Sequence, residues 1–422
     1  MIAWLKSRPA VCWALYDWGN SAFATTVMAG FFPAFFRQFW SAGADGSLTT
    51  YRLGMANAAA GLVIALLAPL LGAIADRGGQ RKRMLLAFSI LGIGTTLSLY
   101  FVGQGQWLPA ATLFALATLG FNGGVVFYDA LLLDVAQPEE LDRVSALGYA
   151  LGYLGGGLLF ALNVFMVVKP TLFGLHDAAE AVRWSFVTVA VWWLVFLLPL
   201  MLYVRESPPT GTASDVSAWT AGWRELAATA RQLRRHKALL QFLLAYWLYI
   251  DGVNTIIKMA VDYGLALGLK SSDLMGALLL TQFVAFPAAV AFGRLGERFG
   301  ARRSLLLGVA VYAALTVWAY YLSSAAEFYA MAVVVGLVQG GVQSLSRSLY
   351  GRLVPEGKSG EFFGFYNMVG KFGTVLGPAL MGVMALLTGS TRVSILSLLL
   401  LFVVGGVLLY RVRSGAAGRA IP

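Results

Sequence analysis

The sequence contains few of the side chains on which metal and thiol chemistry depend. Cys12 is the only cysteine among 422 residues, so no disulfide can form within the chain and no oxidising compartment is indicated. His176 and His236 are the only histidines, and both fall between apolar segments. Because metal sites need clusters of such ligands, we expect no metal and no cofactor, and a protein that is not an enzyme.

Charge is also scarce. Charged residues make up 12% of the chain against 59% hydrophobic residues, and the mean hydropathy is +0.74, which is typical of polytopic membrane proteins. The net charge of +11 comes from short basic clusters between apolar runs, a pattern that favours a membrane surface over nucleic acid. The first apolar run continues past Phe31 without a small-residue cleavage site, so we expect it to remain as a membrane span.

Twelve apolar runs have the roughly 20 residues needed to cross a bilayer. The sequence therefore predicts an all-α polytopic protein with twelve transmembrane helices. The runs cover residues 11–38, 52–75, 83–103, 107–135, 144–168, 183–204, 238–264, 273–296, 302–323, 327–353, 361–388 and 391–411.

Basic residues are distributed unequally between the two sides that these spans define. If the chain starts in the cytoplasm, that side holds 22 Lys and Arg residues and the other side six, which predicts a multi-pass protein of the inner (plasma) membrane with both termini cytoplasmic. The six are Arg37, Arg52, Lys169, Arg183, Lys270 and Arg392.

A breaker-rich segment, RESPPTGTAS, follows the sixth span. It divides the chain into a six-helix half at 1–204, a linker at 205–237 and a second six-helix half at 238–422. Within the linker, Trp219, Trp223 and Leu226 lie on one side of an arginine-rich amphipathic helix that suits the membrane surface. The linker is a hinge between the halves or, alternatively, a regulatory or partner-binding segment.

The seventh span carries a polar face. Trp247, Asp251, Asn254 and Lys258 fall within a narrow arc at 100° per residue, and such a face must look into a protein or water-filled interior because charge is costly in lipid. The first span repeats the pattern, since Trp13, Asp17 and Asn20 precede Trp247, Asp251 and Asn254 by 234 positions each.

Two further repeats relate the halves. GAIADRGGQRK from Gly72 and GRLGERFGARR from Gly293 share one pattern, and Gly123, Gly124, Pro138 and Tyr149 recur 217 positions later. Parallel six-span repeats predict two pseudo-symmetric halves, as in the major facilitator fold.

These two loops resemble the loop between spans two and three of the major facilitator superfamily and its weaker copy between spans eight and nine. YDWGNSAFATTV from Tyr16, QSLSRSLYGRLVPEG from Gln343 and EFFGFYNMVGKFGTVLGP from Glu361 resemble the bacterial branch related to the fungal vacuolar, autophagy-related amino-acid effluxers. The resemblance implies secondary transport with amino-acid efflux as one prospect, and a gating role for the loops. The gating residues it implies are Gly72, Asp76, Arg77, Gly79, Arg81 and Lys82, with Gly293, Glu297, Arg298 and Gly300 in the second loop.

Three acids and three bases lie within the predicted spans, and pairing would make them tolerable there. Asp251 is either a proton-coupling residue, with Lys258 two turns away, or half of a permanent ion pair with it. Arg347 and Asp129 form a gate or contact the substrate. The six charged residues are Asp17, Asp129, Asp251, Lys258, Arg347 and Lys371.

The resemblance implies that spans one, four, seven and ten line a central cavity. Arg347 and Lys371 could bind a carboxylate while Asp17 or Asp251 meets an ammonium group, which suits a zwitterion. A sugar or polyol would suit the amides equally well, and Trp13 and Trp247 are further candidates for the cavity lining. The amide candidates are Asn20, Asn254, Gln339 and Gln343.

We therefore predict a monomeric secondary active transporter for a small polar solute, coupled to protons or uncoupled, that contacts membrane lipid and no nucleic acid. A carrier of sugars, drugs or inorganic ions is the alternative within transport. A non-transporting membrane sensor is the alternative of another class, although the longest stretch outside the spans is only about thirty residues.

Overall fold

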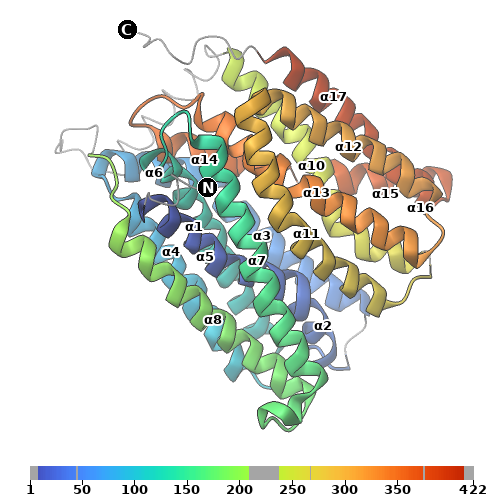
Figure 1. The fold of residues 1–422 in the computed structure, drawn as a ribbon. Helices are drawn as coiled ribbons and strands as arrows, with labels where there is room; N and C mark the ends of the chain where they lie inside the picture. Colours follow the sequence, from blue (N-terminus) through green and yellow to red (C-terminus); the bar gives the residue numbers. More distant parts are fainter. Residues whose placement is uncertain (1–7, 44–45, 209–236, 267, 374–375, 413–422) are drawn as a thin grey trace.

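The structure is a computed structural model that describes residues 8–43, 46–208, 237–266, 268–373 and 376–412, and it is built of helices (Figure 1). The amphipathic helix predicted around Trp219, Trp223 and Leu226 lies outside the described residues.

The helices follow the predicted spans in order. The first half contains α1 (Arg8–Ala22), η2 (Phe23–Phe31), α2 (Phe32–Phe35), η3 (Phe36–Trp40), α3 (Gly46–Gly78), α4 (Arg81–Ser98), η4 (Leu99–Phe101), α5 (Trp107–Ala130), α6 (Leu132–Val135), α7 (Leu141–Val168), η5 (Pro170–Phe173) and α8 (Ala178–Tyr203). The second half contains α10 (Lys237–Ala266), α11 (Ser271–Phe299), α12 (Ala301–Tyr321), α13 (Ala325–Gly351), α14 (Ser359–Phe372), α15 (Leu376–Thr388), α16 (Thr391–Leu396) and α17 (Leu398–Arg411).

Eleven helical segments in the described chain are long and apolar enough to cross a membrane. The first predicted span, 11–38, completes the twelve, but it is divided because the π-helix η2 follows α1. Pro33 explains the division, since proline has no N–H and its ring displaces the carbonyl one turn earlier. The N–H of Phe32 accordingly donates to Val27, five residues back, which is the π-helical pattern.

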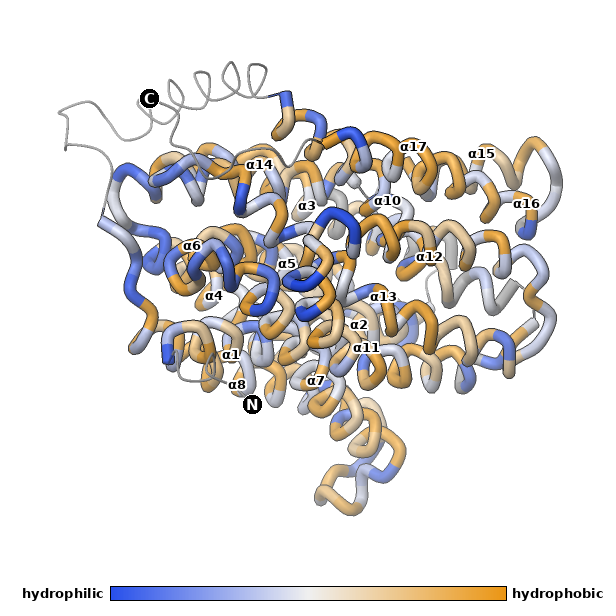
Figure 2. The backbone as a smooth tube through the Cα atoms, turned by 45° about the horizontal axis from the view of Figure 1, so that its top comes forward, coloured by the Kyte–Doolittle hydropathy of each residue, from blue (hydrophilic) through white to orange (hydrophobic). Residues whose placement is uncertain are grey.

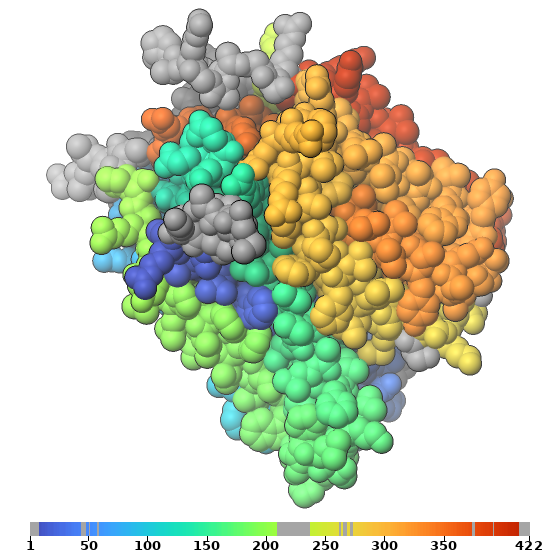
Figure 3. All heavy atoms as spheres, viewed as in Figure 1, coloured from blue at the N-terminus to red at the C-terminus, as the bar shows by residue number. Residues whose placement is uncertain are grey.

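The two halves pack against each other at two places. α3 packs on α14, and α7 packs on α11 and α13. Figure 3 shows α7 and α11 side by side on one face of the molecule. The connection between α7 and α8 nevertheless lies far from the one between α15 and α16 (Figures 1 and 2), so the halves diverge at that end. We call the opposite end, where α1 begins and α17 ends, the predicted cytoplasmic end.

Buried apolar residues form one cluster in each half. One cluster runs from Ala10 to Val204, and the other from Leu239 to Val412 with Ala130 joined to it. Since each half has a core of its own, we propose that 1–204 and 238–422 move as separate units.

Glycines allow α3 and α14 to approach closely. A Cβ on Gly72 would overlap the carbonyl of Gly360, and a Cβ on Gly364 would overlap the backbone of Ala68. Small residues permit such backbone contact between membrane helices. Gly79 and Gly300 each end a loop turn with positive φ, at 57° and 86°, a conformation that favours glycine.

Basic side chains cap the C-termini of four outer helices in a pattern that repeats between the halves. Arg183 donates to the carbonyl of Tyr100 at 2.7 and 2.8 Å, and Arg392 donates to that of Tyr320 at 3.1 Å. At the predicted cytoplasmic end, Lys82 donates to the last turn of α8 and Arg302 to the last carbonyls of α17. Cations are favourable there because helix C-termini carry partial negative charge and unpaired carbonyls.

Candidate functional site

Arg347 is the centre of a polar cluster that joins the halves. It lies on α13 near the predicted cytoplasmic end and is 1% exposed. Its Nη1 lies 2.9 Å from a carboxylate oxygen of Asp129 on α5, and its Nε and Nη2 donate to the hydroxyl and carbonyl of Ser145 on α7 at 2.9 and 2.8 Å. A buried guanidinium is tolerable when its donors are satisfied in this way.

Aromatic rings surround the same guanidinium. The Cζ atom of Arg347 lies 4.3 Å from the ring centre of Tyr149, 4.9 Å from that of Trp13 and 5.3 Å from that of Tyr128. Trp13 and Tyr128 stack at 4.3 Å, and the indole of Trp13 donates to the Tyr128 carbonyl at 2.8 Å. Trp13 is therefore a buried wall of the cation site rather than an open cavity residue.

Two residues of α14, Asn367 and the predicted Lys371, reach across to α5. Asn367 donates to the second oxygen of Asp129 at 3.0 Å, and Lys371 donates to the amide oxygen of Asn122 at 2.6 Å. The structure thus brings Asp129 and Arg347 into one network between the halves, and Lys371 makes a separate contact between the same two helices, α5 and α14.

The glutamines of α13 occupy the next turns away from the predicted cytoplasmic end. Gln343 accepts a hydrogen bond from Tyr153 of α7, which adds another contact between the halves. Gln339, one turn further on, is buried.

Asp17 and Asn20 of α1 have different surroundings. Asp17 is half-buried and accepts one hydrogen bond, from Ser21 at 3.0 Å. Asn20 is 1% exposed, and neither polar atom of its amide has a partner among the described residues. It follows Tyr16 by one turn, and Tyr16 bonds to Ser89 within the first half, so Asn20 points into that half.

Asp251 does not pair with Lys258, in contrast to one of the two sequence-based alternatives. It is fully buried and accepts the backbone N–H groups of Leu376 at 2.9 Å and Gly377 at 3.0 Å, where α15 begins. Its neighbour Asn254 donates to the carbonyl of Gly373, just after α14 ends, at 3.3 Å. Asp251 binds the start of α15 because the unpaired N–H groups and the dipole of a helix N-terminus attract a carboxylate.

Lys258 and Trp247, the other two residues of the predicted polar face of α10, have surroundings different from those of Asp251 and from each other. Lys258 is exposed and makes no hydrogen bond or ion pair with the residues that the structure describes. Trp247 lines an apolar groove of about 290 Å³ between α10 and α14 rather than a polar cavity, because its flat ring packs beside leucines and phenylalanines. Its neighbours there are Leu240, Leu243, Leu244, Phe365, Met368, Val369 and Phe372.

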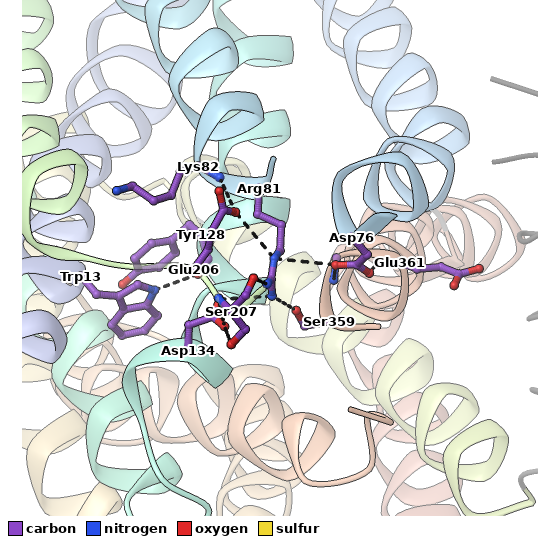
Figure 4. A network of polar contacts seen from close by, with 11 residues as sticks. Trp13, Asp76, Arg81, Lys82, Tyr128, Asp134, Glu206, Ser207, Ser359 and Glu361 are labelled. Atoms are coloured by element: carbon purple, nitrogen blue, oxygen red, sulfur yellow. Dashed lines mark hydrogen bonds and ion pairs between the residues drawn. The ribbon is translucent and has the colours of Figure 1, made fainter. Parts of the chain in front are cut away.

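The loop between α3 and α4, for which the resemblance implies a gating role, contacts the second half at the predicted cytoplasmic end (Figure 4). Asp76 accepts the N–H groups of Gly360 and Glu361 at the start of α14, both at 2.9 Å. Arg81 pairs with Asp134 at 3.1 Å and donates to Ser359, so α3, α4, α6 and α14 meet there.

Other residues of the two loops make further contacts or are exposed. The backbone N–H of Lys82 also donates a hydrogen bond to the carboxylate of Glu206 at 3.3 Å. In the second loop, Glu297 pairs with Arg143 of α7 at 2.7 Å, and a Cβ on Gly293 would overlap Ala146. Arg77 and Arg298 are exposed.

Several residues of this network escaped the sequence analysis. Asp142, at the start of α7, accepts hydrogen bonds from Ser348 and from Arg352, the latter at 2.6 Å. Ser145 holds Arg347, and Asp134 holds Arg81. Asp142 stands 217 positions before Ser359, the partner of Arg81, so the internal repeat could have drawn attention to it.

No group of three or more His, Cys, Asp or Glu residues in the described chain is placed to hold a metal ion. The polar network is instead made of cation–carboxylate pairs and backbone contacts. Such an arrangement can hold two halves of a protein together and release them, and it can bind charged solutes.

Comparison with known proteins identifies the family. Residues 46–420 match the family described as vacuole effluxer Atg22 like. A Bacillus subtilis (strain 168) protein described as the uncharacterized MFS-type transporter YxiO is 36% identical over 405 residues, covering 94% of this chain and 93% of that protein. Autophagy-related protein 22 of Yarrowia lipolytica is 26% identical over 291 residues, covering 62% of this chain and 48% of that protein. The chain belongs to the Atg22-like family and is a major facilitator superfamily (MFS) transporter.

Solved structures confirm the predicted fold. The transporter FucP in its outward conformation matches with a TM-score of 0.73 and 11% identity, covering 98% of this chain and 99% of that one. The proton:xylose symporter XylE matches with a TM-score of 0.71 and 12% identity, covering 96% and 94%. At these identities the likeness shows the fold, which is the twelve-helix major facilitator fold in two pseudo-symmetric halves. The chain is therefore a multi-pass membrane transporter of small-molecule solutes.

Proposed function

We propose that this transporter moves zwitterionic amino acids out of the cell across the plasma membrane, in exchange for protons, with both termini cytoplasmic. The observation that carries the proposal is a separation of charge: the first half contributes the incompletely bonded carboxylate of Asp17, and the second half contributes the ammonium groups of Lys258 and Lys371. A solute with an ammonium and a carboxylate group complements both halves.

The position of Asp17 supports its part in this site. It lies one turn beyond Trp13 on the same face of α1, and the Trp13 ring lies 4.9 Å from Arg347 of the second half. The Asp17 carboxylate lies beside Gly152 of α7, about 6 Å further from the predicted cytoplasmic end than the Arg347 cluster does. Its second oxygen can accept a hydrogen bond from an ammonium group.

Lys258 and Lys371 both lie in the second half, whereas Asp17 lies in the first half. Lys371 stands two residues before Gly373, which Asn254 contacts, and Lys258 lies one turn beyond Asn254 on α10. An exposed ammonium within a predicted membrane span requires water or an anion nearby, because charge in lipid is costly. The solute carboxylate can supply the anion.

The network around Arg347 borders this site on the side of the predicted cytoplasmic end. Asp129, Ser145 and Asn367 bind across the halves directly beneath Asp17, and the Asp76 and Arg81 contacts seal the outermost layer. All of these residues lie in the parts of their helices nearer the predicted cytoplasmic end. The site is thus closed towards that end while the halves diverge at the other (Figure 1).

Asp17 is also our candidate for proton coupling, in place of Asp251. Asp251 is fully buried and bound to two backbone N–H groups, so a proton could reach it only if α15 moved away. Asp17 is half-buried and has one hydroxyl donor. If a proton and the solute ammonium compete for one carboxylate, each leaves as the other binds, which produces exchange.

The same site offers fewer suitable binding groups to sugars and polyols than to amino acids. They would depend on amides, but Asn20 points into the first half, Asn254 is engaged with Gly373, and Gln343 is engaged with Tyr153. The charged groups would then have no complement in the solute.

The test is a panel of labelled amino acids, sugars and inorganic anions in proteoliposomes, with a pH gradient and with or without a protonophore. We expect amino acids to be moved, and the protonophore to abolish their accumulation. Asp17→Asn should lose the response to the pH gradient and bind at least tenfold more weakly, whereas Glu139→Gln, which removes an exposed charge, should behave as wild type. Movement of sugars alone, or an Asp17→Asn variant that still responds to the gradient, overturns the proposal.

A further inference from the structure

A second pocket lies at the end of the molecule opposite the Arg347 cluster. It has a volume of about 460 Å³ and is lined by the first turns of α5 and the early turns of α3. This volume falls within the range of small-molecule sites. Its lining residues are Tyr51, Arg52, Met55, Ala56, Trp107, Leu108, Ala111, Thr112, Ala115 and Leu116.

The pocket opens on the side of the first half that is turned towards the second half. On α5, Leu108 and Ala115 precede Asn122 at intervals of seven residues, so they share its face, and Asn122 accepts the hydrogen bond from Lys371. On α3, Tyr51 lies five turns before Pro69, where α14 packs at Gly364. The pocket therefore lies in the diverging part of the cleft, on the route between the outer end and Asp17.

Arg52 is the only charged residue among the described residues that line this pocket. Its guanidinium carbon lies 3.8 Å from the ring centre of Trp107, a stacking contact that fixes the plane of the group and leaves the N–H donors at its edge. Arg52 makes no hydrogen bond or ion pair with the described part of the chain. Its donors are therefore available to a carboxylate, which a guanidinium can bind through two hydrogen bonds.

The rest of the lining determines what the carboxylate carries. Met55, Leu108 and Leu116 present apolar surface that is 37 to 58% exposed, and the hydroxyl groups of Tyr51 and Thr112 are uncharged polar neighbours. Covering such surface is favourable by roughly 25 cal/mol per Å². No acidic side chain lines the pocket, so a solute ammonium group would remain in water.

We propose that this pocket is an outer subsite for a carboxylate that bears an apolar side chain, such as a leucine-like amino acid, which it holds before or after the solute occupies the Asp17 site. The proposal rests on the proposed function and deepens it, because it selects apolar amino acids over small or polar ones. Arg52 binds the carboxylate, Trp107 holds Arg52, and Met55, Leu108 and Leu116 contact the side chain.

The experiment measures exchange of external L-leucine and of glycine in proteoliposomes of oriented protein. Arg52→Gln should raise the KM for leucine about tenfold and leave Vmax unchanged, because one charge-assisted contact is lost at a site that is not the translocation site. Thr112→Trp, which fills the pocket, should raise the leucine KM towards that of glycine. Lys169→Gln removes an exposed charge at the same end without touching the pocket and serves as the control.

The outcomes separate the two proposals. If wild type moves no amino acid, the proposed function fails. If wild type moves leucine but both pocket variants keep its KM and its preference over glycine, the subsite fails while the function stands. If Arg52→Gln changes only the dependence of transport on the phosphatidylglycerol content of the vesicles, Arg52 binds a lipid headgroup and the subsite is likewise overturned.

Discussion

Asp251 and Leu376 are joined by a hydrogen bond of 2.9 Å in which the carboxylate accepts the backbone N–H at the start of α15. Gly377 donates to the other oxygen, and Asn254 binds the Gly373 carbonyl after the end of α14. α10 thus satisfies backbone groups on both sides of the division in the eleventh predicted span. Asp251, which the sequence analysis takes as a candidate transport residue, instead binds the N-terminus of a helix.

Replacing Asp251 should therefore cost stability, whereas replacing Lys258 should not. Asp251→Ala leaves two buried N–H groups unpaired, and we expect a loss of roughly 1 to 3 kcal/mol for each. Lys258→Ala changes an exposed side chain and should stay within about 0.5 kcal/mol of wild type. Thermal unfolding of the purified variants in detergent measures both. Equal losses for the two variants would mean that an ion pair between them matters, contrary to the contacts observed.

The polar face of α10 illustrates how far the sequence could lead. Helical periodicity correctly predicts that Asp251 faces the protein interior, because a charged side chain that faced the lipid would be costly whatever its partners are. Periodicity cannot tell which partner it meets, since its partners are backbone N–H groups exposed only where α14 and α15 are separate helices. Gly373 and Pro378 mark the place where that span divides, since proline has no N–H for the preceding turn, but they do not tell which side chain binds the N–H groups that the division leaves unpaired.

Arg347 and Asp129 should behave as a coupled pair. Removing either one leaves a buried charge without its partner, which costs roughly 3 to 5 kcal/mol, and removing both leaves neither charge unpaired. We expect Arg347→Ala and Asp129→Ala each to reduce the yield of folded protein, and the double variant to be more stable than either single variant.

A double-mutant cycle on thermal unfolding tests this coupling. The coupling energy should be at least about 1 kcal/mol in favour of the double variant. Additive losses would show that Arg347 depends on Ser145 and its aromatic neighbours rather than on Asp129.

The same cluster shows which site residues the sequence could not supply. Arg347 and Asp129 stand out because they are charges inside apolar runs. Ser145 and Tyr149 do not stand out, since serine and tyrosine are ordinary in membrane helices and only the packing of α7 on α13 brings them to the guanidinium. The internal repeat predicts the pairing of the halves, but it contains no information on which side chains meet across them.

The arginine caps that recur in the two halves should both stabilise the fold. Arg183→Met and Arg392→Met each remove a cation from a helix C-terminus and a donor from its carbonyl, at Tyr100 and Tyr320 respectively. We expect Arg392→Met to lower the free energy of unfolding by about 1 kcal/mol, from the helix dipole and one charged hydrogen bond, and Arg183→Met to lower it further, because Arg183 donates two hydrogen bonds. Lys270→Met, an exposed cation on the same side, is the control and should change little. A Lys270 variant as unstable as the other two would point to surface charge instead of capping.

Contact between α3 and α14 should be required for closing the predicted cytoplasmic end. Gly72→Ala places a methyl group on the Gly360 carbonyl and should force the helices apart, which would remove the backbone N–H groups of α14 from Asp76. We expect transport to fall at least tenfold. Gly61→Ala lies on the same helix where a Cβ meets nothing within 4 Å, so it should leave transport intact and stabilise the helix by up to about 1 kcal/mol.

Access to Ser359 reports the separation directly. Ser359 is 3% exposed and bonded to Arg81, so Ser359→Cys should react slowly with a membrane-impermeant maleimide in the wild-type background. It should react at least tenfold faster together with Gly72→Ala, and at the wild-type rate together with Gly61→Ala. The parent chain, whose only cysteine is the buried Cys12, gives the background. An unchanged rate in the Gly72 variant would show that α14 tolerates the methyl group, and the contact would then have no part in closure.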